Sequence, residues 1–317
     1  MNDKVTATLP ALVRPLLQAR LPGWLAPRWY TSKDEAMALA PGAEIAWLDM
    51  QSKSDMATAI TQAVDVRWLN SVYAGVDGIP LHTLAERGAV LTNGAGLNAI
   101  TIAEYVVMGM LTIAKGYREV VRAQDRHEWL TVSPGKVELL GSKALVLGYG
   151  AIGQGVQERL AAFGVKVTVV RSRPDASIGA LGPQQWRARL GEFDWVILAV
   201  PATSQTLGMI GAAELAAMKP GAVLLNVARG SVVDTVALVA ALQTRHLGAA
   251  FLDVTDPEPL PADHVLWSLD NAHVTMHLSG RSQSLMFVRG AERFLDNLAR
   301  YRKGETLKYR VNLNLGY

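Results

Sequence analysis

The sequence predicts an α/β protein with parallel β-sheets that is divided into two lobes. Short apolar runs alternate with Ala- and Leu-rich amphipathic runs through most of the 317 residues. This alternation is the strand–helix–strand rhythm of a parallel sheet. The length fits two modest domains better than one, since a domain averages roughly 150 residues. A second series of strand patterns begins at Lys143, after a long helical stretch.

The first hundred residues predict one sheet with helices between its strands. We expect strands near Lys4–Leu9, Glu44–Leu48, Val66–Val72 and Val90–Thr92. Ser54 is predicted to cap one of the intervening helices, because serine accepts a hydrogen bond from a first-turn amide. A mainly helical stretch then runs from Asn98 to about Trp129, interrupted only at Gly109 and Gly116, and Ser133-Pro134-Gly135 closes it.

The remaining chain predicts a second sheet and a final helix. Strands are expected near Ala144–Leu147, Lys166–Val170, Trp195–Val200, Ala222–Asn226 and Gly248–Asp253. The last helical pattern covers about Arg281–Tyr301 and leaves a short tail, Gly304–Tyr317.

Composition excludes several classes of protein. Apolar residues make up 50% of the chain and charged residues 19%, which argues against disorder. Lys and Arg number 31 against 28 Asp and Glu, with no basic block that would indicate a nucleic-acid partner. The absence of cysteine removes disulfides, thiolate nucleophiles and Cys-bound metals. With no apolar run of membrane-spanning length and no signal-peptide pattern, we expect a cytoplasmic protein with no membrane partner.

A glycine motif predicts a dinucleotide site. Gly148-Tyr149-Gly150-Ala151-Ile152-Gly153 follows the strand at Ala144–Leu147 and precedes a helix expected at Gln154–Phe163. The first glycine allows the tight turn, the second lets backbone approach a pyrophosphate, and the third lets helix and strand pack closely. A glycine-rich turn without a ligand is the alternative, but the strand, helix and second strand favour the dinucleotide. The expected contacts include Gly148, Gly150, Ala151, Ile152 and Gly153.

The end of the second strand predicts which nicotinamide cofactor is preferred. NAD-binding folds usually carry an acid there for the ribose hydroxyls, but this chain has Arg171-Ser172-Arg173. Arginine attracts a 2′-phosphate, so we expect NADPH to be preferred and NADH to be possible. The alternative is that both arginines are solvated surface charges. Val200 and Pro201, at the end of the strand near Trp195–Val200, complete the expected cofactor contacts.

Three downstream motifs make the prediction specific. They are Asn226-Val227-Ala228-Arg229-Gly230, then 253–261 (DVTDPEPLP), and Met276-His277-Leu278-Ser279-Gly280. With the glycine motif, they resemble the D-isomer-specific 2-hydroxyacid dehydrogenases, particularly the glyoxylate/hydroxypyruvate reductase branch. The resemblance covers nearly the whole chain, from Tyr73-Ala74-Gly75-Val76-Asp77 and Asn93 to the terminal Gly316-Tyr317.

The resemblance implies a fold, a reaction and an assembly. The fold is two Rossmann-like or flavodoxin-like lobes, with a cofactor lobe (about 99–281) inserted into a substrate lobe (about 1–98 plus 282–317). The reaction is reduction of a small 2-oxoacid, of the glyoxylate or hydroxypyruvate type, to the D-2-hydroxyacid by hydride transfer from NAD(P)H. The assembly is a homodimer formed through the helix after Asn98.

The resemblance also assigns site residues. Arg229 binds the substrate carboxylate and carbonyl, His277 donates the proton, and Glu258 is the partner of His277. Asp253 contacts the nicotinamide carboxamide, and the backbone of Ala74 and Gly75 completes the carboxylate pocket. Trp47 and Tyr73 are expected to line the substrate pocket. Met276 departs from the family, which usually has proline before the histidine.

The residue types suit this chemistry without the family name. Reduction of a ketone leaves charge on oxygen, and histidine, with an ordinary pKa near 6.5, can supply a proton near neutrality. A carboxylate partner orients the ring and favours the imidazolium. A planar arginine can hold a 2-oxoacid at two points. Each residue alone is more often structural than catalytic, and only their joint occurrence favours the functional interpretation.

Several alternatives remain open on the sequence. Formate dehydrogenase chemistry is less favoured, since that branch pairs its histidine with glutamine rather than a residue like Glu258. Phosphoglycerate dehydrogenase is less favoured because no regulatory domain follows the final helix. A nucleotide-sensing binding protein or corepressor on the same fold, and another 2-oxoacid specificity, are the other candidates. His273 and His277 are four residues apart, but no third ligand is apparent and we predict no metal.

Overall fold

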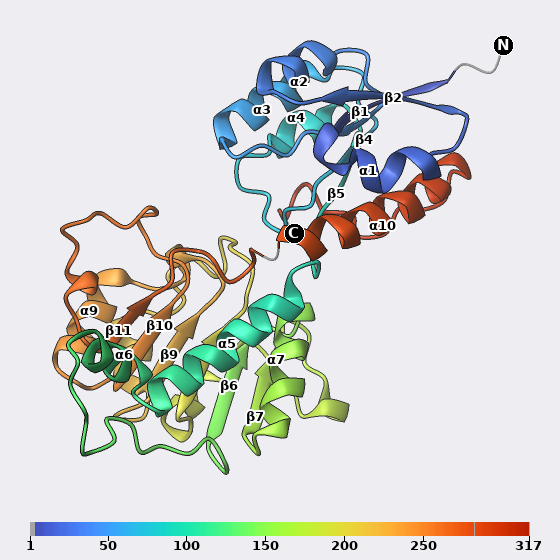
Figure 1. Cartoon of the computed structure of the whole chain (residues 1–317). Coiled ribbons are helices and arrows are strands. Elements are labelled where there is room, and N and C mark those ends of the chain that lie inside the picture. The colour runs from blue at the N-terminus through green and yellow to red at the C-terminus, as the bar shows by residue number, and fades with distance from the viewer. Residues whose placement is uncertain (1–3, 282, 317) are drawn as a thin grey trace. The chain divides into compact units, whose positions relative to one another are not determined.

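Two compact units make up the chain, each built on a parallel sheet covered by helices. The computed structural model describes residues 4–281 and 283–316. The first unit takes Met1–Asn98 with Ser282–Tyr317, and the second takes Ala99–Arg281 (Figure 1). All strand pairs in both sheets are parallel, which confirms the predicted fold class. Tyr317, one half of the terminal motif, lies outside the described residues.

The first unit contains a five-stranded sheet in the order β2-β1-β3-β4-β5. Its strands are β1 (Val5–Pro10), β2 (Leu25–Tyr30), β3 (Ile45–Trp47), β4 (Trp68–Asn70) and β5 (Val90–Thr92). Its α-helices are α1 (Arg14–Leu17), α2 (Lys33–Leu39), α3 (Lys53–Gln62), α4 (Leu81–Glu86) and α10 (Gln283–Arg302). Two 3₁₀ turns, η1 (Ala11–Val13) and η2 (Gln18–Arg20), flank α1.

Two details of the first unit differ from the prediction. Strand β2 was not expected, because Pro27 and two aromatic residues obscure its pattern. It lies at the edge of the sheet beside β1, where a proline is tolerated. The N-cap of α3 is Ser52 rather than Ser54, and its Oγ accepts a hydrogen bond from the Asp55 amide at 3.2 Å.

The second unit contains a six-stranded sheet in the order β11-β10-β9-β8-β6-β7. Its strands are β6 (Lys143–Leu147), β7 (Lys166–Val170), β8 (Trp195–Leu198), β9 (Val223–Asn226), β10 (Ala249–Leu252) and β11 (Ala272–Val274). Its α-helices are α5 (Ala99–Ala114), α6 (Tyr117–Asp125), α7 (Ala151–Ala162), α8 (Ala212–Ala217) and α9 (Thr235–Gln243). Its 3₁₀ helices are η3 (Ala176–Ile178), η4 (Arg187–Glu192), η5 (Gly230–Val232) and η6 (Val265–Trp267).

The order of the second sheet places a topological switch at β6. β7 lies on one side of β6, at the edge of the sheet. The chain then crosses to the other side of β6, where β8, β9, β10 and β11 follow in order. Loops that leave the carboxyl ends of β6 and β8 therefore diverge to opposite faces of the sheet. Such a crevice is where open α/β sheets bind their ligands.

The helical stretch predicted from Asn98, with interruptions at Gly109 and Gly116, is two helices that are separated at Gly116 only. α5 ends at Ala114, α6 begins at Tyr117, and the axis bends by 70° between them. Gly116 makes the break, with a φ of 61°. Gly109 does not interrupt the helix; it lies within α5, close enough to the Phe251 ring that a Cβ would be 2.8 Å from it. Among the described residues, only this bent pair has the length and hydropathy of a membrane span, and no single helix does.

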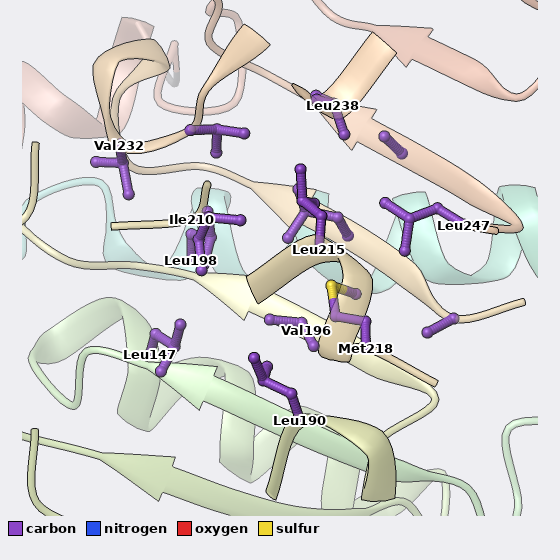
Figure 2. Packing of buried hydrophobic residues seen from close by; sticks show 14 of the residues in the cluster. Leu147, Leu190, Val196, Leu198, Ile210, Leu215, Met218, Val232, Leu238 and Leu247 are labelled. Carbon is purple, nitrogen blue, oxygen red and sulfur yellow. The ribbon is translucent and has the colours of Figure 1, made fainter. Parts of the chain in front are cut away.

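Alternate residues of the second sheet supply two separate cores. Leu147, Val196 and Leu198 point to the face covered by α8, α9 and η4, where Figure 2 shows them packed with Leu215 and Leu238. Their strand neighbours, such as Val146 and Ile197, point to the opposite face against α5 and α7. Burial on both faces explains why these strands read as continuous apolar runs.

Candidate active site

The glycine motif forms a tight turn from β6 into α7. Gly148 has a φ of 103°, and a Cβ there would lie 2.4 Å from the Ala199 carbonyl oxygen. A Cβ on Gly153 would lie 2.1 Å from the Gly148 carbonyl oxygen. Neither position accepts a side chain, as the motif predicts.

Gly150 differs from these two because the space beside it is open. No described atom lies within 4 Å of a Cβ built there. Gly150 is also the N-cap of α7, and no side chain caps it. The helix begins at Ala151, three residues earlier than predicted, so Ala151, Ile152 and Gly153 form its first turn. An open, uncapped helix start at a switch point fits the pyrophosphate of a dinucleotide.

The other cofactor candidates follow the strands on either side of β6. Arg171, Ser172 and Arg173 follow β7, and Val200 and Pro201 follow β8. The Arg171 side chain is 39% exposed, and its Nη1 lies 3.4 Å from Oδ2 of Asp175. This contact and two hydrogen bonds from Ser177 lower the pKa of Asp175, the Ser177 bonds having the larger effect. The arginine is therefore held at the strand end by a weak, partly exposed ion pair.

Arg229 follows β9, and a buried amide shapes the turn that presents it. The Asn226 side chain is 1% exposed; its Nδ2 donates to the Arg229 carbonyl at 2.9 Å, and its Oδ1 accepts from the Ala228 amide at 3.0 Å. Arg229 is partly buried, and its Nη1 donates to the Ala228 carbonyl at 2.8 Å. The arginine thus stands on a turn with a defined backbone conformation.

Glu258 and His277 form a close pair. Nδ1 of His277 lies 2.6 Å from Oε1 of Glu258, and both side chains are about two-fifths exposed, at 40% and 42%. An ionised carboxylate only accepts, so Nδ1–H is the donor and Nε2 remains for another partner. This is the geometry of an oriented acid/base histidine. The two residues are 19 positions apart in the sequence, and the segment between them includes all of β11.

Asp253 holds the loop that carries His277. Its carboxylate, 2% exposed, accepts hydrogen bonds from the Thr275 hydroxyl at 2.9 Å and from the Leu278 and Ser279 amides at 3.0 and 3.1 Å. The Ser279 hydroxyl also donates to it. The Asp253 carbonyl oxygen accepts from the His277 amide at 2.5 Å. These bonds support a backbone in which Met276 and His277 have φ values of 54° and 55°, a region that non-glycine residues rarely adopt.

The neighbouring histidine has a different environment. His273 lies in β11, where burial lowers its pKa to about 4, with Arg118 and Arg122 contributing. Its imidazole is therefore neutral near pH 7.

The second unit brings most of the predicted site residues to one sheet edge. Arg229, Glu258 and His277 follow β9, β10 and β11, which are adjacent parallel strands, so their loops leave the same edge as the glycine turn. Ala74 and Gly75 belong to the first unit, in the loop after β4. Trp47 was wrongly expected to line a pocket: it is fully buried, with its ring centroid 5.6 Å from that of Phe294.

Comparison with known proteins places this arrangement in a family. The family model described as "D-isomer specific 2-hydroxyacid dehydrogenase, NAD binding domain" matches residues 107–279, more than half of the chain. The chain belongs to the D-isomer-specific 2-hydroxyacid dehydrogenases. The resemblance found in the motifs is confirmed. The second unit contains the NAD-binding domain of that family.

Individual relatives differ in their substrates. The chain is 31% identical over 252 residues to (S)-sulfolactate dehydrogenase of Chromohalobacter salexigens, covering 78% of this chain and 82% of that protein. It is 29% identical over 289 residues to D-3-phosphoglycerate dehydrogenase of Archaeoglobus fulgidus, covering 89% of this chain. The match spans only 54% of that relative's length.

Solved structures of the family have the same fold. A D-isomer-specific 2-hydroxyacid dehydrogenase family protein from Aeromonas salmonicida is 29% identical, with a TM-score of 0.87 over 98% of this chain and 99% of that one. A D-isomer-specific 2-hydroxyacid dehydrogenase from Xanthobacter autotrophicus Py2, in complex with NADPH and MES, is 26% identical, with a TM-score of 0.80. That alignment covers 99% of this chain and 100% of the other.

The sequence assigned no role to three polar residues of this site, although Asn226 and Ser279 lie within the quoted motifs. Asn226, Thr275 and Ser279 supply hydrogen bonds that shape the Arg229 and His277 loops. A signal exists for two of them, since Asn226 is the last residue of the buried strand β9 and Thr275 follows β11 directly. Sequence alone does not tell whether such a residue meets a ligand or its own backbone.

Proposed function

We propose that this dehydrogenase reduces a small 2-oxoacid, of the glyoxylate or hydroxypyruvate type, to the D-2-hydroxyacid. The observation that carries the proposal is the 2.6 Å His277–Glu258 pair on the sheet edge that also holds Arg229 and the glycine turn. A general acid, its carboxylate partner and a bidentate cation are what ketone reduction requires of a protein.

The proposed roles follow from the hydrogen bonds that each side chain can donate or accept. Bound NAD(P)H supplies the hydride. His277, with Nδ1 held by Glu258, gives the Nε2 proton to the carbonyl oxygen as negative charge develops there. Arg229 binds the substrate carboxylate and polarises the carbonyl. The backbone of Ala74 and Gly75 and the Asp253 contact with the nicotinamide carboxamide are further parts of this proposal.

A substrate panel tests the activity. Purified enzyme is mixed with NADPH and with glyoxylate, hydroxypyruvate, pyruvate, phosphohydroxypyruvate or sulfopyruvate, and loss of nicotinamide absorbance is followed. We expect the highest kcat/KM for glyoxylate or hydroxypyruvate. Faster turnover of phosphohydroxypyruvate or sulfopyruvate would contradict the proposed substrate and would favour a specificity like that of the phosphoglycerate or sulfolactate dehydrogenases. Cofactor binding without turnover of any member would favour a nucleotide-sensing binding protein.

We further propose a preference for NADPH, carried by Arg171 and Arg173 at the end of β7. A net 1.4–2.8 kcal/mol from one or two partly exposed arginine–phosphate contacts corresponds to roughly ten- to a hundredfold in kcat/KM. Arg171→Asp should impair NADPH far more than NADH, because it repels the 2′-phosphate. The measurement is kcat/KM for both cofactors at one ionic strength, and the NADPH advantage should shrink at high salt.

Asp175 provides a matched control for this prediction. Its carboxylate lies 3.4 Å from Arg171 and competes with a phosphate for the same guanidinium. Asp175→Asn keeps an oxygen for the Ser177 amide that it accepts at 3.1 Å, but removes the charge. The NADPH preference should therefore rise in this variant. A wild-type preference for NADH would contradict the proposal, and both arginines would then be interpreted as solvated surface charges.

A homodimer and a cytoplasmic location complete the proposal. Large apolar side chains stand exposed on α5, α6 and the segment after them, including Met108, Tyr117, Val132 and Leu140. Trp129 is 93% exposed. Monomeric proteins rarely expose so much apolar surface in one region, and a second copy of the chain can cover it symmetrically.

Light scattering after size-exclusion chromatography tests the dimer. The wild type should have twice the mass of one chain, and Trp129→Ser should shift the equilibrium toward the monomer as the protein is diluted. Leu12→Ser is the control, since Leu12 is an equally apolar side chain, 66% exposed, that belongs to the first unit. A monomeric wild type, or equal weakening by both variants, would contradict the proposal.

A further inference from the structure

A partly buried carboxylate in the first unit has no part in the chemistry above. Asp49 lies two residues beyond the carboxyl end of β3. Strand β3 is the neighbour of β4 in the sheet. Its Oδ1 accepts a hydrogen bond from the Ser71 hydroxyl at 2.6 Å. Its Oδ2 accepts from the Val72 amide at 2.7 Å and from Nε1 of Trp47 at 2.8 Å. Two of these three donors belong to the loop that follows β4.

The same loop is held from its other side by residues after β5. The Gly94 amide donates to the Tyr73 carbonyl at 2.8 Å, and Nδ2 of Asn93 donates to the Ala74 carbonyl at 2.7 Å. Within the loop, the Ser71 hydroxyl also accepts from the Tyr73 amide at 3.1 Å. The backbone from Ser71 to Ala74 is thus fixed between Asp49 and the Asn93–Gly94 turn. Gly75 follows directly.

We infer that Asp49 is a positioning residue for substrate binding, which fixes the backbone that leads into Ala74 and Gly75. The inference rests on the proposed function, in which that backbone receives the carboxylate of the 2-oxoacid. Preorganised amides bind an anion better than mobile ones, because no ordering is needed at the moment of binding. Loss of the Asp49 contacts should therefore weaken substrate binding more than it slows hydride transfer.

The charge on Asp49 makes this positioning sensitive to pH. Crowding by protein atoms around the carboxyl raises its pKa to about 6, despite the opposing effect of the bonds from Ser71, Val72 and Trp47. The titratable groups packed nearby are the phenols of Tyr30 and Tyr73; Asp49 and Tyr73 both help to raise the pKa of Tyr30, after burial as the main cause. Protonation of Asp49 adds an O–H where three donors already converge, so the loop should loosen as the pH falls below 6.

The sign of the effect on stability is opposite to that on binding. A carboxyl whose pKa is raised in the folded state takes up its proton more readily there than in the unfolded chain. The ionised form of Asp49 therefore lowers stability above its unfolded pKa of 3.8, and the full loss is present above about pH 6. The negative charge of Asp49 therefore holds the loop but lowers the stability of the folded state.

Kinetics of Asp49→Ala and Asp49→Asn between pH 5.5 and 8 test the inference. Asp49→Ala should raise KM for glyoxylate by about tenfold, with kcat within about threefold and NADPH affinity unchanged. Asp49→Asn can accept from Val72 and Trp47 and donate to Ser71, so it should restore much of the binding. The ratio of the wild-type KM to the Asn-variant KM should rise as the pH falls through 6. Taking this ratio at each pH removes every pH effect that the two enzymes share. Asp65→Ala, at an exposed site of the same unit, is the control.

Hydrogen exchange separates this inference from the proposed function. Exchange at the Val72 and Tyr73 amides should accelerate in Asp49→Ala and not in Asp65→Ala, whether or not any 2-oxoacid is turned over. If the wild type reduces no 2-oxoacid while exchange responds as expected, the proposed function fails and the positioning by Asp49 stands. An unchanged exchange rate, or a KM for Asp49→Ala within twofold of wild type, would overturn the inference.

Discussion

Replacing His277 by alanine is expected to lower kcat for 2-oxoacid reduction by roughly 10²- to 10⁴-fold, the usual contribution of a general acid. The imidazole is held by Glu258 at 2.6 Å, and its loop is anchored on Asp253, so Nε2 has a defined direction. The variant removes the proposed proton donor and leaves the glycine turn intact. Steady-state kinetics with saturating NADPH measure the loss, and fluorescence titration of NADPH should show unchanged affinity.

Glu258→Gln gives a finer test of the same pair. Glutamine still accepts from Nδ1 of His277 but provides no negative charge, so the imidazolium needed for reduction is less favoured. The alkaline limb of the pH profile for reduction should move to lower pH, with a smaller loss of kcat at pH 6 than at pH 8. A limb that stays in place would leave Glu258 without its proposed role. Wild-type activity in His277→Ala would show that His277 is not the proton donor.

The inner strands β8, β9 and β10 could be predicted because every residue in them is buried, which makes them continuous apolar runs. β7 occupies the predicted range, and β6, β9 and β10 begin or end within one residue of theirs. The glycine turn was predictable for another reason. Gly148 and Gly153 each approach backbone too closely for a side chain, so only glycine fits at these positions and the sequence shows it directly.

Two kinds of feature could not be predicted: those that depend on partners distant in sequence, and a helix cap for which two nearby residues are equally suited. Strand β2 contains Pro27 and is defined only by its pairing with β1. Ser52 and Ser54 are equally good caps by residue type, and only the position of the first turn decides between them. Trp47 has the aromatic character of a pocket residue, but Phe294, almost 250 positions later, buries it.

The roles of buried acids show the same limit within the site. The sequence identifies Asp253 as a residue near the cofactor, and that assignment stays a prediction. It could not reveal that the carboxylate accepts from Thr275, Leu278 and Ser279, because those donors lie on a separate loop. The left-handed conformation of Met276 and His277 in that loop could not be predicted either, since no glycine marks these positions.

Replacing Arg229 by alanine is expected to lower kcat/KM for the 2-oxoacid by roughly 30- to 1000-fold, or about 2–4 kcal/mol of transition-state stabilisation. The guanidinium is partly buried on a turn that Asn226 holds at both its carbonyl and its amide, so the cation is preorganised. Alanine removes both the carboxylate contact and the polarisation of the carbonyl, so KM should rise and kcat should fall together. Steady-state kinetics on glyoxylate or hydroxypyruvate separate the two constants.

Arg229→Lys shows which property of the arginine matters. Lysine keeps the positive charge but has no planar fork, so it can attract the carboxylate without holding carboxylate and carbonyl at once. Its KM should recover more than its kcat relative to the alanine variant. NADPH affinity should be unchanged in both, because the glycine turn and the end of β7 lie on other loops. A kcat/KM for Arg229→Ala within a few-fold of wild type would show that the guanidinium does not touch the substrate. The carboxylate would then have to be bound by other groups, and the backbone at Ala74 and Gly75 would be the first place to look.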